Sequence, residues 1–187
     1  FHCSDNKLYM FELFSNTNEL TWVYQLEFDS IPAVLDFKKG DLDAILISST
    51  NKLVVWTTDQ IPYEITDVPT ITSMCEYNDV LYCTIGSDAE KVWYTETLDP
   101  ETIGKQGANY ILLDANIGGG RKVLQFNESV YVFCDYGIYR INIYAKDYPV
   151  ARLIYSGLGQ IYPDTITVCG THILFVTSAG VYKFNGD

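Results

Sequence analysis

The chain has 187 residues, of which 48% are hydrophobic and 14% aromatic, so it carries enough apolar side chains for a substantial core and is not intrinsically disordered. Its net charge of -12 raises the electrostatic cost of approaching a polyanion, which argues against sequence-specific nucleic-acid binding. No apolar run approaches the roughly 18 residues that a membrane-spanning helix needs, so we expect no membrane span.

The predicted elements are strands, and they recur in one order along the chain. Residues 3–11, CSDNKLYMF, match residues 48–56, SSTNKLVVW, so a truncated copy of the pattern opens the sequence. Each complete copy has a short apolar strand, a polar turn, a second apolar strand, another turn and a third strand. These copies occupy residues 33–56, 71–94, 122–141 and 165–184. Their spacing of about 43 residues is typical of one propeller blade.

A fourth, outer strand is predicted after each third strand, in TWVYQLEF, PYEITDV, NYILLD and ARLIY. The second strands are almost continuously apolar, as expected where neighbouring sheets cover both faces. We therefore predict an all-β fold, a β-propeller fragment of about four to five four-stranded blades. The expected divisions of this single region, 1–187, are a blade part at 1–28, blades at 31–68, 69–114 and 121–155, and a blade part at 162–187. Both ends read as cuts, so we expect the region to be incomplete at each.

Turn residues fit this register. Asn78-Asp79, Asn127-Glu128 and Gly170-Thr171 lie between first and second strands, where residues that tolerate a left-handed backbone are favoured. The connection at residues 96–109, ETLDPETIGKQGAN, is longer than the others. It is a candidate functional protrusion.

Motifs for catalysis are not found in the sequence. The nucleophile elbow, the P-loop and the dinucleotide fingerprint are missing, and the three glycines at 118–120 lead into a strand, which favours a flexible link over phosphate binding. Four acids in turns suit either calcium binding or plain solvation, and the lack of EF-hand spacing favours solvation. These acids are Asp41, Asp43, Asp88 and Glu90. We predict no enzymatic activity, no cofactor and no metal.

The cysteine count is five, an odd number, and most of these residues lie in apolar strand-like runs. Buried free thiols in a reducing compartment are the favoured interpretation. Cys75 and Cys83 flank a predicted hairpin turn, and a disulfide between them is the alternative.

Two segments carry a resemblance to a known family. Residues 91–103, KVWYTETLDPETI, and 123–141, VLQFNESVYVFCDYGIYRI, resemble the propeller tail proteins of short-tailed bacteriophages, the nozzle and DNA-stabilising proteins of the tail tip. The matching features are the run from Val92 to Thr95 with the following Pro100, and the Gly, apolar, Tyr, Arg, apolar ending at 137–141.

The resemblance implies a non-enzymatic virion component, assembled in the host cytoplasm as a homo-oligomeric ring with other tail subunits around the DNA exit channel. The ring would retain the packaged DNA and then let it pass without sequence-specific contact, and contact with the host surface is a further implication. The alternatives are a propeller module that binds proteins or glycans through its loops, and a glycosidase or lyase using acids such as Asp41 or Asp135. The predicted partner-binding residues are Glu96, Asp99, Pro100, Lys105, Tyr148 and Tyr162.

Overall fold

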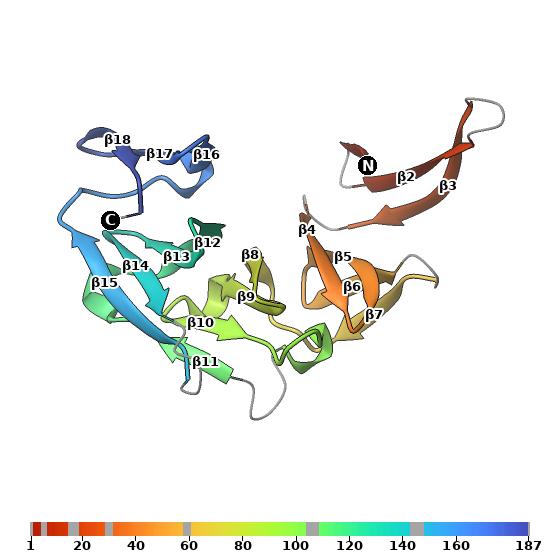
Figure 1. Ribbon diagram of the computed structural model, residues 1–187, viewed down its shortest axis with the longest axis horizontal. Coiled ribbons are helices and arrows are strands. Elements are labelled where there is room, and N and C mark those ends of the chain that lie inside the picture. The colour runs from red at the N-terminus through yellow and green to blue at the C-terminus, as the bar shows by residue number, and fades with distance from the viewer. Residues whose placement is uncertain are drawn as a thin grey trace.

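The structure is a computed structural model that describes residues 2–4, 7–14, 19–28, 32–57, 61–103, 109–142 and 148–186, with side chains from residue 27 onward. Its described strands form five antiparallel sheets of consecutive strands, three of them four-stranded and two three-stranded. Figure 1 shows the sheets one after another around an arc, with β4, β8 and β12 toward its centre and β7, β11 and β15 outside. The predicted all-β propeller fold is confirmed.

We number the sheets as blades in chain order. Blade 1 contains β1 (His2–Ser4), β2 (Lys7–Phe14) and β3 (Glu19–Glu27). Blade 2 contains β4 (Ala33–Lys39), β5 (Leu42–Ser49), β6 (Lys52–Thr57) and β7 (Tyr63–Thr66). Blade 3 contains β8 (Ile71–Tyr77), β9 (Val80–Ile85), β10 (Lys91–Tyr94) and β11 (Asn109–Leu112). Blade 4 contains β12 (Gly120–Phe126), β13 (Ser129–Cys134), β14 (Gly137–Asn142) and β15 (Val150–Ser156). Blade 5 contains β16 (Thr167–Cys169), β17 (His172–Thr177) and β18 (Gly180–Phe184).

Short 3-10 helices occur only in connections, within the described part of the chain. They are η1 (Gly86–Asp88), η2 (Pro100–Thr102), η3 (Ala115–Ile117) and η4 (Pro163–Thr165). None of the described helices is long and apolar enough to cross a membrane.

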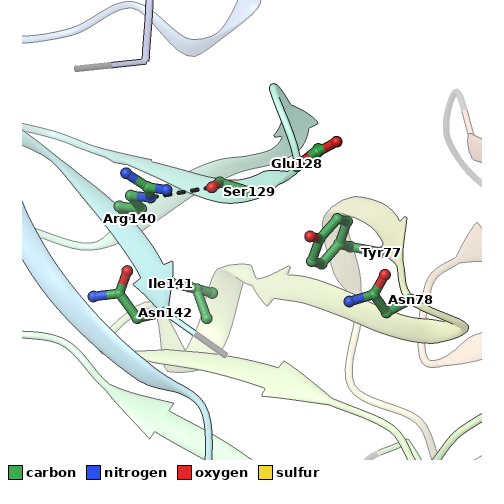
Figure 2. Close-up of a pocket in the computed structure, with 7 residues that line it drawn as sticks. All are labelled: Tyr77, Asn78, Glu128, Ser129, Arg140, Ile141 and Asn142. Carbon is green, nitrogen blue, oxygen red and sulfur yellow. Dashed lines mark hydrogen bonds between the residues drawn. The ribbon is translucent and has the colours of Figure 1, made fainter. Parts of the chain in front are cut away.

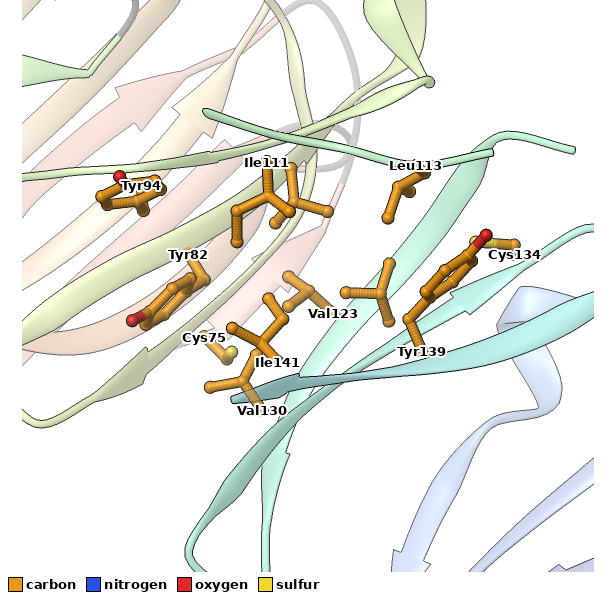
Figure 3. Close-up of a cluster of buried hydrophobic side chains, with 12 residues drawn as sticks. Cys75, Tyr82, Tyr94, Ile111, Leu113, Val123, Val130, Cys134, Tyr139 and Ile141 are labelled. Carbon is orange, nitrogen blue, oxygen red and sulfur yellow. The ribbon is translucent and has the colours of Figure 1, made fainter. Parts of the chain in front are cut away.

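The cores lie between blades. Every residue of β13 is buried, because blade 3 covers one face of its sheet and blade 5 the other, whereas every residue of the outer strand β15 is at least partly exposed. Figure 3 shows the cluster between blades 3 and 4, in which Tyr82, Ile111 and Cys75 face Val123 and Val130. Similar clusters join blades 2 and 3 and blades 4 and 5. Each blade thus depends on its neighbours to bury its apolar side chains.

The predicted turn chemistry is confirmed at three of the turns between first and second strands. Asn78 and Asp79 both have positive φ, at 51° and 64°, and so do Asn127 and Glu128, at 45° and 56°. Two consecutive left-handed residues are the signature of the type I′ turn, whose twist matches that of the flanking strands. Gly170 also has positive φ, at 58°.

The cysteines argue against the alternative disulfide. Cys75 pairs in register with Tyr82 and not with Cys83, and the two sulfurs belong to cores on opposite faces of blade 3. Both thiols are free and buried, and desolvation raises the pKa of each. Burial likewise raises the pKa of Cys134 to about 12.

These environments predict a sharp difference in thiol reactivity. Because only the thiolate reacts readily, we expect Cys75, Cys83 and Cys134 to resist iodoacetamide at pH 8 in the native protein and exposed Cys169 to react. Peptide mass spectrometry with and without denaturant measures the labelling residue by residue. Fast labelling of Cys83 without denaturant would contradict the buried position.

Candidate functional site

The two ends of the sheets form two different faces of the arc. Because the strands are consecutive and antiparallel, turns between first and second strands lie at the same end as connections between third and fourth strands. We call this end the loop face. The opposite end, the connector face, carries the turns between second and third strands and the links from one blade to the next.

On the connector face, backbone hydrogen bonds join the links between blades to the turns between second and third strands. Gly120 N donates to Ala89 O at 2.7 Å, and Ile161 N donates to Asp135 O at 2.8 Å, so the links from blade 3 to 4 and from blade 4 to 5 are each tied to the second turn of the preceding blade. Ser178 N likewise donates to Gln160 O at 2.8 Å. These hydrogen bonds pair backbone groups of the links with backbone groups of the second turns.

Asp135 is the main side-chain anchor of the connector face. The guanidinium of Arg121 donates to both its carboxylate oxygens, each at 2.8 Å, and Gly119 N donates to Oδ2 at 3.1 Å. The ion pair with Arg121 lowers the pKa of Asp135 despite partial desolvation. Asp135 thus holds the link at 118–120 against blade 4, and a low-pKa carboxylate in a bidentate pair is a poor general acid.

The first part of the long connection, residues 96–103, lies on the loop face and holds two blades together, and we call it the clamp. Leu98 N donates to Asp79 O at 2.7 Å, and Leu98 O accepts from Gly40 N at 3.1 Å, so one residue joins the first turns of blades 2 and 3. Asp99 accepts from Glu101 N at 3.0 Å and caps η2, while Pro100 and Ile103 are buried. Residues 96–103 therefore fold back onto the blades.

A polar contact fixes the clamp to blade 2. Glu101 accepts hydrogen bonds from Lys39 and from the hydroxyl of Tyr63, the latter at 2.8 Å. The hydrogen bond to Glu101 is the main cause of the raised pKa of Lys39. The segment at residues 91–103, which resembles the phage tail proteins, thus joins blades 2 and 3.

The predicted partner-binding residues do not form one cluster. Glu96 and Tyr148 lie on the loop face, and Tyr148 is close enough to Tyr94 to contribute, after burial, to the raised pKa of that phenol. Tyr148 is also one of the most exposed large side chains, at 78%. Tyr162 lies on the connector face, where it precedes η4. Lys105 lies outside the described residues.

A polar pocket of about 170 Å³ opens on the loop face between blades 3 and 4, where the sequence predicted no site. Figure 2 shows Tyr77 and Asn78, from the first turn of blade 3, on one side and residues of blade 4 on the other. The lining residues are Tyr77, Asn78, Glu128, Ser129, Arg140, Ile141 and Asn142.

The turn acids suggested as calcium ligands are not gathered into a site. Asp88 forms an ion pair with Lys91 at 2.8 Å. Within the described ranges, no group of three or more His, Cys, Asp or Glu side chains is placed to hold a metal ion.

Comparison with known proteins bears on the fold. No protein-family profile matches the chain, and no curated protein sequence matches it. Among solved structures, Kluyveromyces lactis Hsv2 with its complete loop 6CD shares 15% identity at a TM-score of 0.55, covering 96% of this chain and 58% of that one. Kluyveromyces marxianus Hsv2 shares 15% identity at a TM-score of 0.54, covering 89% and 51%. A catalytically inactive virginiamycin B lyase from Staphylococcus aureus with quinupristin shares 13% identity at a TM-score of 0.51, covering 91% and 61%.

The chain therefore spans between about half and six-tenths of the length of these structures. One of them is an enzyme, but identities this low show a common fold and nothing about activity. The chain is a β-propeller region.

Proposed function

We propose that this chain is a non-enzymatic structural part of the tail of a short-tailed bacteriophage, a nozzle-type propeller beside the DNA exit channel. The observation that carries the proposal is the clamp at residues 96–103. The segment that resembles the tail proteins joins the first turns of two blades through Leu98 and fixes them through Glu101. A sequence motif used to hold blades together suits a mechanical component.

Two further observations support a structural role. Asp135, the acid considered for catalysis, is held in a bidentate pair with Arg121, and the pKa of its carboxyl is lowered. The net charge of -12 repels the phosphate backbone, so a duplex that the ring holds back before ejection can then slide past without adhering to it. The proposed partners are other tail subunits in a ring, and the proposed location is the virion tail after assembly in the host cytoplasm.

The test is imaging of the full-length protein and of virions labelled with an antibody raised against this chain. We expect ring-shaped particles by negative stain and label at the tail tip. Virions that lack the protein should package DNA and then lose it. Dispersed monomers together with unlabelled virions would overturn the proposal, as would full retention of DNA in its absence.

A second candidate function is a module that binds a protein or glycan partner through the loop face. The pocket between blades 3 and 4 favours it, because residues of two blades line one opening there. A glycan array with the purified chain tests this candidate, and reproducible binding that disappears on changing pocket residues would support it. Binding that survives those changes would place any ligand elsewhere.

A further inference from the structure

The clamp places a carboxylate of blade 3 against two hydrogen-bond donors of blade 2. Glu101 Oε1 accepts from Lys39 Nζ and, at 2.8 Å, from the hydroxyl of Tyr63. Lys39 ends β4 and Tyr63 begins β7, whereas Glu101 lies in η2, which follows the third strand of blade 3. Hydrogen bonds from such donors to an ionised carboxylate are among the stronger ones in proteins. Blade 2 thus presents a binding geometry for a carboxylate, and the chain itself fills it.

The two donors are held against each other. Lys39 Nζ donates to the hydroxyl oxygen of Tyr63 and lies 4.6 Å from the centroid of its ring. Burial is the main reason why the pKa of Tyr63 is raised, so its hydroxyl keeps its proton and can donate it to a carboxylate. Because the ammonium and the hydroxyl are already arranged, a ligand that binds them loses little free energy in ordering them.

A further polar group on the same face of blade 2 has no partner. Thr57 pairs in register with Ala44, and the side chains of paired residues point to the same side of a sheet, here toward blade 3. Tyr63 packs against the same cluster. Thr57 is 2% exposed, and its hydroxyl finds no hydrogen-bond partner among the described residues, which is unfavourable. Glu101 therefore leaves a polar group of this face unsatisfied.

The Glu101 side chain can leave without unfolding the clamp. It is 39% exposed and that of Lys39 is 32% exposed, so water competes for both partners of the ion pair and the pair contributes little net stability. The clamp is held independently by the backbone hydrogen bonds of Leu98 and by the burial of Ile103. Rotation of the Glu101 side chain alone therefore opens the two donors to a carboxylate from outside.

We propose that Lys39 and Tyr63 form a carboxylate-binding site, the cradle, which Glu101 occupies from within the chain and a carboxylate from outside occupies in its place. Glu101 is then an autoinhibitory contact that keeps the cradle closed until a ligand competes for it. The ligand is a small free carboxylate or an acidic side chain of a partner protein. The proposal is independent of the tail role and of the pocket between blades 3 and 4.

Removal of the internal carboxylate tests the proposal, with sodium acetate as the probe. In Glu101→Ala we expect acetate to raise the melting temperature in a saturable way, compared with sodium chloride at the same ionic strength. Acetate should bind Glu101→Ala at least about tenfold more tightly than the unaltered chain, where tethered Glu101 competes at a high effective concentration. NMR signals of labelled tyrosine rings, assigned to Tyr63, follow the binding directly.

Variants locate the site. Adding Lys39→Gln to Glu101→Ala should weaken acetate at least about tenfold, because the charged donor is lost. Glu64→Ala is the matched control, because it removes the carboxylate of another exposed ion pair of blade 2, that with Lys52 at 2.7 Å. It should change acetate affinity less than about twofold. Glu101→Gln, which removes only the charge, should also bind acetate more tightly than the unaltered chain and gives a second route if Glu101→Ala fails to fold.

A capped Gly-Glu-Gly peptide distinguishes the two sources of the carboxylate. Tighter binding of the peptide than of acetate to Glu101→Ala would identify an acidic side chain of a partner, and equal or weaker binding would identify a small free carboxylate.

Three outcomes would overturn the proposal. They are the absence of saturable acetate binding in both Glu101 variants, binding that survives Lys39→Gln, and equally tight binding to Glu64→Ala. None of them bears on whether the chain labels a phage tail.

Discussion

We expect Phe133→Ala to lower the free energy of unfolding by about 3–5 kcal/mol. Phe133 is fully buried on β13, and its ring meets that of Phe175 edge to face at 5.3 Å between centroids. The change removes a large apolar side chain and leaves a cavity between blades 4 and 5. Because both strands are held within their sheets by hydrogen bonds, the site cannot collapse to fill the space.

Urea unfolding followed by circular dichroism measures this loss. Val181→Ala on β18 is the control, because Val181 is 78% exposed and its truncation should change stability by less than about 0.5 kcal/mol. A Phe133→Ala protein as stable as the Val181→Ala protein would mean that blades 4 and 5 are not packed as described.

The second large effect is expected at Gly118, where Ala should cost about 2–6 kcal/mol. Gly118 has φ of +78° and ψ of 178°, a backbone conformation essentially restricted to glycine that costs a residue with a Cβ about 1–3 kcal/mol. The added Cβ would also lie 2.5 Å from the Cβ of Asp135. Asp135 must then move away from Arg121 and from Gly119 N, and lost hydrogen bonds to a charged group cost about 1–3 kcal/mol more.

Gly157→Ala is the control that separates backbone strain from crowding against Asp135. Gly157 has nearly the same φ, +76°, but no atom lies within 4 Å of the position that an added Cβ would take, so only backbone strain should appear. The difference between the two variants in urea unfolding then measures the crowding at Asp135. Equal losses for the two substitutions would show that Asp135 adjusts without cost.

Much of the fold follows from local patterns. The recurring runs place β5, β9, β13 and β17, because short apolar runs rich in β-branched and aromatic residues and bounded by turn residues are typical of buried strands. Asn78-Asp79 and Asn127-Glu128 mark hairpin turns, because Asn and Asp tolerate positive φ better than most residues. The three glycines at 118–120 favour a flexible link by their sequence, and the structure instead shows a close fit of Gly118 and Gly119 against Asp135 and Ala89.

Site residues are harder to predict. Residues 96–109 form a connection of unusual length, but length alone does not tell whether a loop projects or folds back. Pro100 and Ile103 are buried because blade 2 lies close enough to receive them. Tyr148 and Tyr162 are both exposed tyrosines, yet the alternation of antiparallel strands puts them on opposite faces.

The sequence alone determined that this chain forms repeated four-stranded units and where their turns lie, since strand periodicity and turn chemistry are short-range properties. Tertiary structure decided how the blades are joined and where a pocket opens. The clamp through Leu98 joins turns that are far apart in the sequence, and the pocket draws Asn78 from one blade and Arg140 from the next. Such contacts depend on the angle between sheets, which arises from packing between blades and is not encoded in any one repeat.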